Sequence, residues 1–246
     1  MYKLERKNEI LKILSLEKSV SVTSLAEKLY TSLSSIRRDL AVLERQGIIK
    51  RSYGRAELTE ESSVILPFTV RAHSNIPSKK EIAKKALSLV NSGDIIFLDQ
   101  SSSAYFVALE LMSRNDITVV TNNIEIISLL SNSGIEVISS GGRLSKNNRN
   151  CLVGEDAGRI FTEICADLLF FSAKALTDSG EVYDMQRDEI LLRRKMLGNA
   201  KKSAFLCESS KIGRSAPFLQ CSLSELSYLI TEKEPESIGQ FDIEVL

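Results

Sequence analysis

Short apolar runs alternate with stretches of helical spacing from Lys79 to the end of the chain. The six runs are Ile95–Leu98, Thr118–Val120, Val137–Ile138, Leu168–Phe171, Phe205–Cys207 and Tyr228–Ile230. Strands that are apolar throughout and separated by helices are typical of a mainly parallel sheet with helices on both faces. The sequence therefore predicts an α/β domain over residues 79–246.

Polar and small residues follow the predicted strands, at the ends where parallel sheets bind ligands. They are Asp99, Ser101, Ser102, Ser103, Thr121, Asn122, Gly141, Gly142 and Lys211. Hydroxyl groups and the N–H groups at a helix start suit a phosphate, for which we expect Lys211 to supply the counter-charge. Asp99 and Asn122 suit the hydroxyls of a sugar. A serine run alone often only caps a helix, and paired glycines often only form a turn. Because polar and small residues recur after successive strands, the sequence favours a phosphorylated-sugar effector.

Three short amphipathic helices are predicted in residues 1–57. They are Leu4–Leu16, a second helix that begins at Ser21–Ser24, and a third from Leu33 to Gln46 that Ser32 caps and Gly47 ends. We expect a polar break over 15–21 and a tight turn at Tyr30 and Thr31. A third helix capped directly after a tight turn is typical of a helix-turn-helix.

The start of the third helix carries hydroxyl and guanidinium groups, which suit recognition of the major groove. Residues 48–56 alternate like two short strands around Gly54, which predicts a basic wing that contacts DNA phosphates. The expected DNA-binding residues are Ser32, Ser34, Ser35, Arg37, Arg38, Lys50, Arg51 and Arg55. We expect Arg38 to contribute at least as much as Arg37 to the reading of guanine.

The charge of the chain is divided unequally along its length. The formal net charge is +0, but residues 1–56 hold twelve Lys or Arg and six Asp or Glu, so this part carries +6 and the remainder −6. A basic module attached to an acidic one is typical of a DNA reader with a separate sensing domain. Residues 58–78 contain Pro67 and Pro77 and no sustained helical stripe, which predicts a linker between domains 1–57 and 79–246.

Several other classes of protein are disfavoured. The four cysteines, at 151, 165, 207 and 221, form no C-x-x-C pair, and the single histidine, His73, lies in the predicted linker. We therefore expect reduced, mostly buried thiols, no metal and no cofactor. No apolar run approaches the roughly 18–20 residues of a membrane span, so we expect a cytoplasmic protein without a membrane partner.

The first 56 residues resemble the winged helix of the DeoR family of bacterial transcription regulators. The resemblance rests on Ser35-Ile36-Arg37-Arg38-Asp39-Leu40, Leu43-Glu44, Gly47-Ile48-Ile49 and Arg51. It continues in the family's order through Arg71, Asn75, Gly93-Asp94, Phe97-Leu98-Asp99, Val119–Asn122, Gly141-Gly142, Val153-Gly154, Ala166-Asp167, Gly180, Ser210-Lys211 and Ile230-Thr231. It implies a repressor of a sugar-metabolism operon, with a sensor domain that resembles ribose-5-phosphate isomerase in fold and binds a phosphorylated sugar that relieves repression.

The chain departs from the family's pattern at the turns and in the predicted pocket. Tyr30 stands where the family usually has a small residue, and Arg55 where the wing usually has a second glycine. Gln100–Ser103 replaces Gly-Thr-Thr, Glu208 replaces an aspartate, and Ser172 and Lys174 replace a glycine-containing segment. Because loss of a loop glycine forbids some close backbone approaches, the ligand is expected to differ from that of familiar relatives.

Two other functions were weighed. An isomerase or deaminase with a DNA-binding head would need a carboxylate base or a pocket histidine, but Leu168 replaces the catalytic glutamate in the segment 164–168 and no histidine follows His73. Alternatively, the larger domain only mediates oligomerisation. Whether or not the larger domain senses an effector, one winged helix reads too few base pairs for specificity. We therefore expect a homodimer or homotetramer on an operator.

Overall fold

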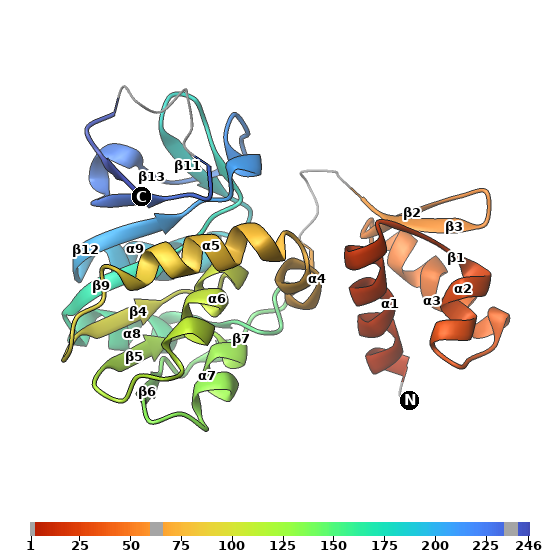
Figure 1. Cartoon of the computed structure of the whole chain (residues 1–246), viewed down its shortest axis with the longest axis horizontal. Coiled ribbons are helices and arrows are strands. Elements are labelled where there is room, and N and C mark those ends of the chain that lie inside the picture. Colours follow the sequence, from red (N-terminus) through yellow and green to blue (C-terminus); the bar gives the residue numbers. More distant parts are fainter. Residues whose placement is uncertain (1–2, 60–65, 234–240) are drawn as a thin grey trace. The chain divides into compact units, whose positions relative to one another are not determined.

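The computed structural model describes residues 3–59, 66–233 and 241–246. The chain divides into two compact units, Met1–Asn75 and Ile76–Leu246, shown in Figure 1. Each unit has a hydrophobic core of its own.

The first unit contains the three predicted helices, α1 (Lys3–Glu17), α2 (Val22–Lys28) and α3 (Leu33–Arg45). Serine caps start two of them, because Ser21 Oγ accepts from Ser24 N and Ser32 Oγ accepts from Ser35 N. After α3, Gly47 adopts a φ of +70°, the left-handed conformation that ends helices. The apolar faces of these helices form one core, which includes Ile10, Leu14, Leu25, Ile36 and Leu40.

A three-stranded antiparallel sheet completes the winged helix. Its strands are β1 (Ser19–Ser21), β2 (Ile49–Ser52) and β3 (Arg55–Leu58), in the order β1-β3-β2. The predicted wing is therefore β2 and β3. The expected polar break over 15–21 is corrected, because its end is a strand in which buried Val20 pairs with Ala56. Three residues are too few to show strand alternation in a sequence.

The predicted linker, 58–78, contains regular structure. Helix α4 (Phe68–His73) begins after Pro67, and α5 (Ile76–Leu87) begins before the expected boundary at residue 79. Val70 of α4 is buried in the core of the first unit. A helix of only six residues is too short to show an apolar stripe, which explains why the sequence pattern missed it.

The second unit is built on a seven-stranded sheet, and the predicted α/β fold class is confirmed. The strands, in spatial order, are β15 (Glu244–Val245), β14 (Tyr228–Ile230), β12 (Ala200–Leu206), β9 (Ala166–Phe171), β4 (Ile95–Leu98), β5 (Thr118–Thr121) and β6 (Glu136–Ser139). All neighbouring strands are parallel.

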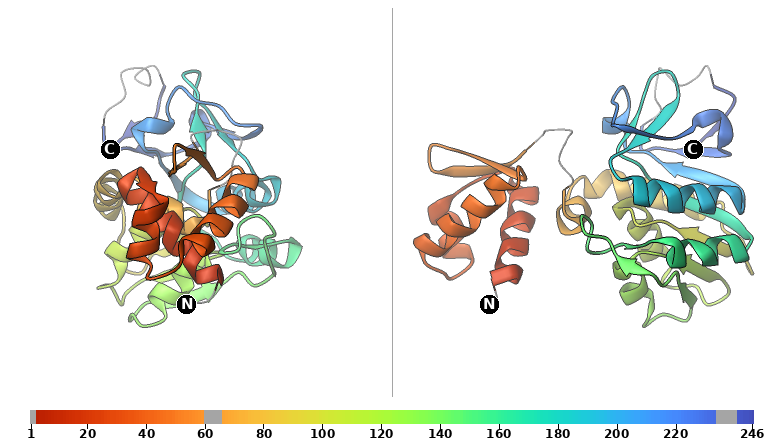
Figure 2. Two further views of the ribbon diagram at one scale, coloured as in Figure 1. Left: turned by 90° about the vertical axis from the view of Figure 1, so that its right-hand side faces the viewer. Right: turned by 180° about the vertical axis from the view of Figure 1, so that it is seen from behind.

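Helices cover both faces of this sheet. Helices α5, α6 (Ser102–Leu111) and α7 (Ile124–Leu130) cover one face, and α8 (Glu155–Glu163) and α9 (Arg187–Gly198) cover the other, as Figures 1 and 2 show. Successive side chains of a strand point to opposite faces of the sheet. In β4, Ile96 and Leu98 belong to the core under α5–α7, whereas Phe97 belongs to the core under α8 and α9. Burial on both faces explains why these strands read as continuous apolar runs.

Two small antiparallel sheets stand beside the main one. Strands β7 (Arg143–Leu144) and β8 (Leu152–Val153) form a pair, and β10 (Ala175–Leu176), β11 (Glu181–Asp184) and β13 (Phe218–Ser222) form a three-stranded sheet. Short 3-10 helices, η1 (Ser209–Lys211) and η2 (Leu223–Glu225), lie on either side of β13 in the chain.

The strand order fixes a topological switch point. From β4 the chain builds outward through β5 and β6 on one side, then returns to place β9, β12 and β14 on the other. The segments leaving β4 and β9 therefore diverge at the carboxyl ends of two adjacent strands. In open α/β sheets this is where ligands bind.

Candidate functional site

The recognition residues predicted from sequence lie together at the start of α3. Ser32, Ser34, Arg37 and Arg38 are exposed and Ser35 is half-buried. The opposite face of the helix carries the buried Ile36 and Leu40, so the polar residues are directed away from the core. An exposed helix start with hydroxyl and guanidinium groups suits reading of the major groove.

The two arginines of α3 differ in their surroundings. Arg38 folds along its own helix, donating from Nε to Ser34 O at 3.3 Å and from Nη2 to Ser35 Oγ at 3.4 Å. Arg37 makes no hydrogen bond or ion pair with the residues that the structure describes. The Arg37 guanidinium is therefore the more available of the two for guanine or phosphate.

The aspartate that follows these arginines points inward. Asp39 is fully buried, and its Oδ2 accepts a 2.6 Å hydrogen bond from Arg6 Nε of α1. This pair ties α3 to α1. The Arg-Arg-Asp segment thus combines two outward cations with one inward anchor.

The three cations predicted to contact phosphate from the wing all have partners within the protein. Arg51 Nε lies 2.8 Å from Glu44 Oε2, and Lys50 Nζ lies 3.5 Å from Glu57 Oε1. Arg55 donates from Nη2 to Ser19 O at 2.7 Å. The hydrogen bond from Arg51 lowers the pKa of Glu44. Exposed ion pairs contribute little to stability, so a DNA phosphate can replace the carboxylates of Glu44 and Glu57.

At the switch point, Asp99 organises the loops around it. Its Oδ1 accepts from Ser101 N at 3.0 Å, and its Oδ2 accepts from Ser172 N at 3.3 Å and from Arg193 Nε at 3.0 Å. The side chain is fully buried. Asp99, which was predicted to contact sugar hydroxyls, thus holds the loops after β4 and β9 through both of its carboxylate oxygens.

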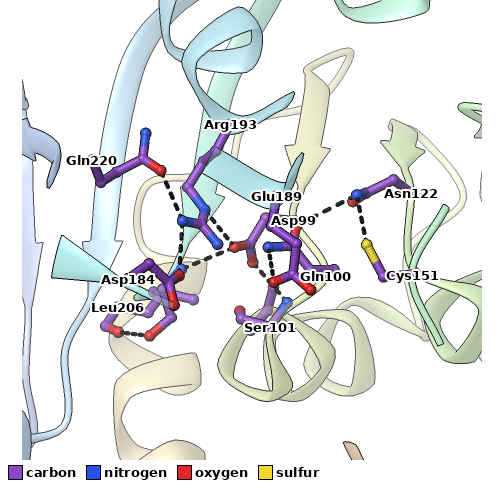
Figure 3. A network of polar contacts seen from close by, with 12 residues as sticks. Asp99, Gln100, Ser101, Asn122, Cys151, Asp184, Glu189, Arg193, Leu206 and Gln220 are labelled. Carbon is purple, nitrogen blue, oxygen red and sulfur yellow. Dashed lines mark hydrogen bonds and ion pairs between the residues drawn. The ribbon is translucent and has the colours of Figure 1, made fainter. Parts of the chain in front are cut away.

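Sequence reasoning missed the partner of Asp99. Arg193, from α9, is buried and also donates from Nη1 to Asp184 Oδ2 at 3.0 Å and to Gln220 Oε1 at 2.8 Å, as Figure 3 shows. Burial alone would lower the pKa of Arg193, but the charges of Asp184 and Asp99 outweigh it and raise the pKa. No local pattern pairs residues so far apart in sequence.

A second buried polar group occupies the neighbouring strand ends. Gln100 Nε2 donates to Glu189 Oε2 at 3.0 Å, and Asn122 Nδ2 donates to Gln100 Oε1 at 3.3 Å (Figure 3). Asn148 Nδ2 donates to the other oxygen of Glu189 at 3.0 Å. Thr121 is also buried, and its Oγ1 accepts from the backbone. Thr121 and Asn122 are therefore both buried where β5 ends.

The start of α6 holds hydrogen-bonding groups that the protein leaves unused. Ser101 caps the helix by accepting from Ala104 N at 3.0 Å. The backbone N–H groups of Ser102 and Ser103 donate to no residue in the described part of the chain. Ser103 Oγ is buried and also lacks a partner there. Free donors at a helix N-terminus suit an anion.

Two lysines lie at this end of the sheet. Lys211 Nζ donates to Ser172 Oγ at 2.8 Å and lies 3.4 Å from Glu208 Oε1. Lys79, buried on α5, lies 3.5 Å from the same carboxylate oxygen. Sequence reasoning assigned only Lys211 to the pocket. Helical spacing could have revealed Lys79, because it shares the inward face of α5 with Ile82 and Ala83.

The paired glycines after β6 have a different role from the serines after β4. Gly142 has a φ of +93°, and a Cβ there would come within 2.8 Å of Val153 O and 2.7 Å of Ala157 Cβ. Gly142 therefore allows close packing against α8. Gly141, with a φ of +66°, borders open space. Both follow β6, at the edge of the sheet and two strands from the switch point.

The segment considered for an isomerase base lies at the wrong end of the sheet. Asp167 stands at the amino end of β9, where Oδ1 accepts from Lys201 Nζ at 2.7 Å and Oδ2 from Ile95 N at 2.9 Å. The hydrogen bond from Lys201 lowers the pKa of Asp167. The residues that follow β9 at its carboxyl end are instead 172–174, Ser-Ala-Lys.

The cysteines are free thiols. Cys151, Cys207 and Cys221 are buried and Cys165 is exposed. Burial raises the pKa of Cys207 and Cys221 to about 12. In the described ranges no cluster of three or more His, Cys, Asp or Glu residues is arranged to hold a metal ion, and no helix is long and apolar enough to cross a membrane.

A winged helix-turn-helix with an exposed, basic recognition helix, joined to an α/β domain, defines a DNA-binding transcription regulator. The DeoR-like helix-turn-helix domain matches residues 6–62, and the DeoR C-terminal sensor domain matches residues 74–233. The chain belongs to the DeoR family, which confirms the resemblance predicted from its motifs.

Curated relatives match over nearly the whole chain. The HTH-type transcriptional regulator GolR of Listeria innocua is 33% identical over 95% of this chain and 92% of its own. The L-fucose operon activator of Escherichia coli is 31% identical over 94% of this chain and 96% of its own. The HTH-type transcriptional repressor GlcR of Bacillus subtilis is 30% identical over 96% and 90%. All three are named as regulators of transcription or of an operon.

Similarity to solved structures is more distant. Ribose 5-phosphate isomerase A from Methanocaldococcus jannaschii is 19% identical, with a TM-score of 0.41 over 55% of this chain and 53% of its own. The delta subunit of eIF2B from Chaetomium thermophilum is 18% identical, with a TM-score of 0.45 over 65% and 57%.

Proposed function

We propose that this regulator represses a sugar-metabolism operon and that a phosphorylated sugar relieves the repression. The names of three relatives support the link to sugars: an L-fucose operon activator, a putative aga operon transcriptional repressor and the repressor GlcR. Because one of these is an activator, the sign of regulation is a separate outcome of the tests below.

The observation that carries this proposal is the set of unused donors at the start of α6. A phosphate there accepts from the N–H groups of Ser102 and Ser103 and from Ser103 Oγ, and it gains from the positive end of the helix. Lys211 lies nearby, linked through Ser172 to Asp99 and so to the Ser101 N–H. It supplies a counter-charge for the phosphate.

The sugar is recognised by amide groups beyond the phosphate. Asn122 Oδ1 and Asn123 Nδ2 are buried and have no partner in the described part of the chain. These atoms are one acceptor and one donor, which matches the hydrogen-bonding capacity of sugar hydroxyls. They take the role that sequence reasoning gave to Asp99.

Two serines of α6 provide a matched test of the phosphate site. Ser103→Ala removes a hydroxyl that bonds to nothing described, so the variant should fold as well as the unchanged chain but bind phosphorylated sugars more weakly. Ser101→Ala removes the helix cap, so it should lose about 1 kcal/mol of stability. Thermal-shift titration with pentose and hexose phosphates, the matching free sugars and inorganic phosphate measures both effects. If no phosphorylated sugar stabilises the unchanged chain, the effector proposal fails.

DNA binding by this chain is proposed to need at least a homodimer. A single α3 reads only a few base pairs, whereas two copies read half-sites about 10 base pairs apart. The protein accordingly acts in the cytoplasm as a homodimer or homotetramer on duplex DNA. Light scattering of the full chain, with and without DNA, tests this; a monomer at micromolar concentration would contradict it.

A further inference from the structure

The tip of the wing presents a tyrosine in an unusual conformation. Ser52 pairs with Arg55, so Tyr53 and Gly54 form the two-residue turn between β2 and β3. Their φ angles are +49° and +75°. Such turns strongly favour asparagine and glycine, because a bulky side chain is strained at positive φ. Tyr53 therefore makes the turn less stable than asparagine or glycine would at this position.

Among the described residues, no contact compensates for this strain. The side chain of Tyr53 is 103% exposed, so its ring buries no surface. It also makes no hydrogen bond with the described residues. The ring is therefore available to a partner outside the chain, and the position of Tyr53 on the wing decides which partner that is.

The turn that carries Tyr53 is held firmly in place. Gly54 O accepts a 3.0 Å hydrogen bond from Val22 N, the first residue of α2. Arg55 donates to Ser19 O at 2.7 Å and to Ser19 Oγ at 3.0 Å. The β3 side of the tip is therefore fixed to β1 and to the start of α2. Because the backbone of the turn is already ordered, little backbone freedom is lost when the tip binds.

The wing also lies next to the recognition helix. Strand β2 follows α3 after a short turn, and the Arg51–Glu44 ion pair joins the strand to the helix. The other wing cations, Lys50 and Arg55, already have protein partners. Tyr53 is the large side chain that the tip presents without such a partner.

We propose that Tyr53 binds DNA by packing its ring against the deoxyribose–phosphate backbone beside the groove that α3 enters. The inference rests on DNA binding by the winged helix and not on the effector. Backbone contacts from tyrosine position a protein on the duplex without reading its bases. The proposed contact is apolar and uncharged, so it differs in kind from the ionic contacts that the neighbouring cations make with phosphate.

Tyr53→Gly is the decisive variant. Glycine relieves the strained turn, so the unfolding temperature of the full-length protein should stay equal or rise. DNA affinity should nevertheless fall about tenfold, in keeping with the loss of one aromatic packing contact. The loss should be equal on the duplex that the unchanged chain selects from a random pool and on an unrelated duplex of the same length. Fluorescence anisotropy over a range of salt concentrations measures this.

The salt dependence identifies the kind of contact. Because tyrosine is uncharged, Tyr53→Gly should leave the slope of log affinity against log salt unchanged, whereas Lys50→Ala should reduce it by about one. Tyr53→Phe keeps the ring and should bind within about twofold of the unchanged chain. Unchanged affinity in Tyr53→Gly, or a loss confined to the selected duplex, would overturn the proposal.

Tyr30 offers a matched control. It lies in the turn between α2 and α3, with a φ of +47° and 97% exposure. Tyr30→Gly relieves the same kind of strain and removes the same side chain from the same domain. It should raise or preserve the unfolding temperature and leave DNA affinity within about twofold. An equal loss of affinity in both variants would assign the effect to the turns rather than to a contact by Tyr53.

Discussion

Arg37 and Arg38 are adjacent in sequence, yet their side chains are differently available. Arg38 bonds to Ser34 and Ser35 of its own helix, whereas Arg37 has no partner in the described part of the chain. Periodicity predicted that both would be exposed. It could not predict which one folds back, because that depends on local hydroxyl and carbonyl acceptors. The sequence expectation was that Arg38 contributes at least as much as Arg37.

The surroundings of the two side chains favour the opposite order, with Arg37 contributing more. Arg37→Ala should cost about 1–3 kcal/mol of operator binding free energy, and Arg38→Ala should cost less, because Arg38 must first leave its intrahelical bonds. Neither side chain is buried, so both variants should unfold at the same temperature as the unchanged chain. Anisotropy titrations on the selected duplex measure the two losses. Normal binding by Arg37→Ala together with weak binding by Arg38→Ala would restore the order expected from sequence.

Among individual residues, the helix caps were the most predictable from sequence, and the partners of buried charges were the least predictable. The caps at Ser21 and Ser32 and the left-handed Gly47 follow from local backbone chemistry that sequence displays directly. The role of Asp99 depends on Arg193, which reaches it only after the sheet has formed. A carboxylate after a strand therefore indicates a crevice without revealing whether it faces a ligand or the protein.

Among the elements, the parallel strands were predictable and the small antiparallel sheets were not. Both faces of β4 and β9 are buried, so these strands read as apolar runs. Strand β11, Glu-Val-Tyr-Asp, buries only Val182 fully and resembles a loop in sequence. The switch point could not be predicted because the order of strands depends on tertiary packing.

Arg193 joins α9 to the loop after β4 and to both longer strands of the β10-β11-β13 sheet. Arg193→Met should destabilise the protein by about 3–5 kcal/mol, because it leaves the buried Asp99 without its counter-charge. Denaturant unfolding measures the loss. Adding Asp99→Asn to this variant should recover part of it, since the uncompensated charge is then absent. If the double variant is as unstable as the sum of the two single variants, the two side chains are not coupled.

For the whole molecule, we propose that a ligand in the α/β domain changes DNA binding by the winged helix. The two domains carry opposite net charges, +6 and −6 on either side of residue 56. Allosteric coupling between two sites is typically about 1–3 kcal/mol, or roughly 5–150-fold in affinity. Composition and family resemblance predicted the two functions, but the strength and sign of their coupling depend on conformational states that sequence does not display.

The most direct test measures operator affinity of the full-length protein with and without the phosphorylated sugar that binds it best. The unchanged chain should lose roughly 5–150-fold in affinity when the sugar phosphate is added. Lys211→Ala should keep operator affinity but lose this response, whereas Arg214→Ala, which removes an exposed cation three residues further along, should respond normally. A sugar phosphate that binds tightly yet leaves operator affinity unchanged would contradict the account.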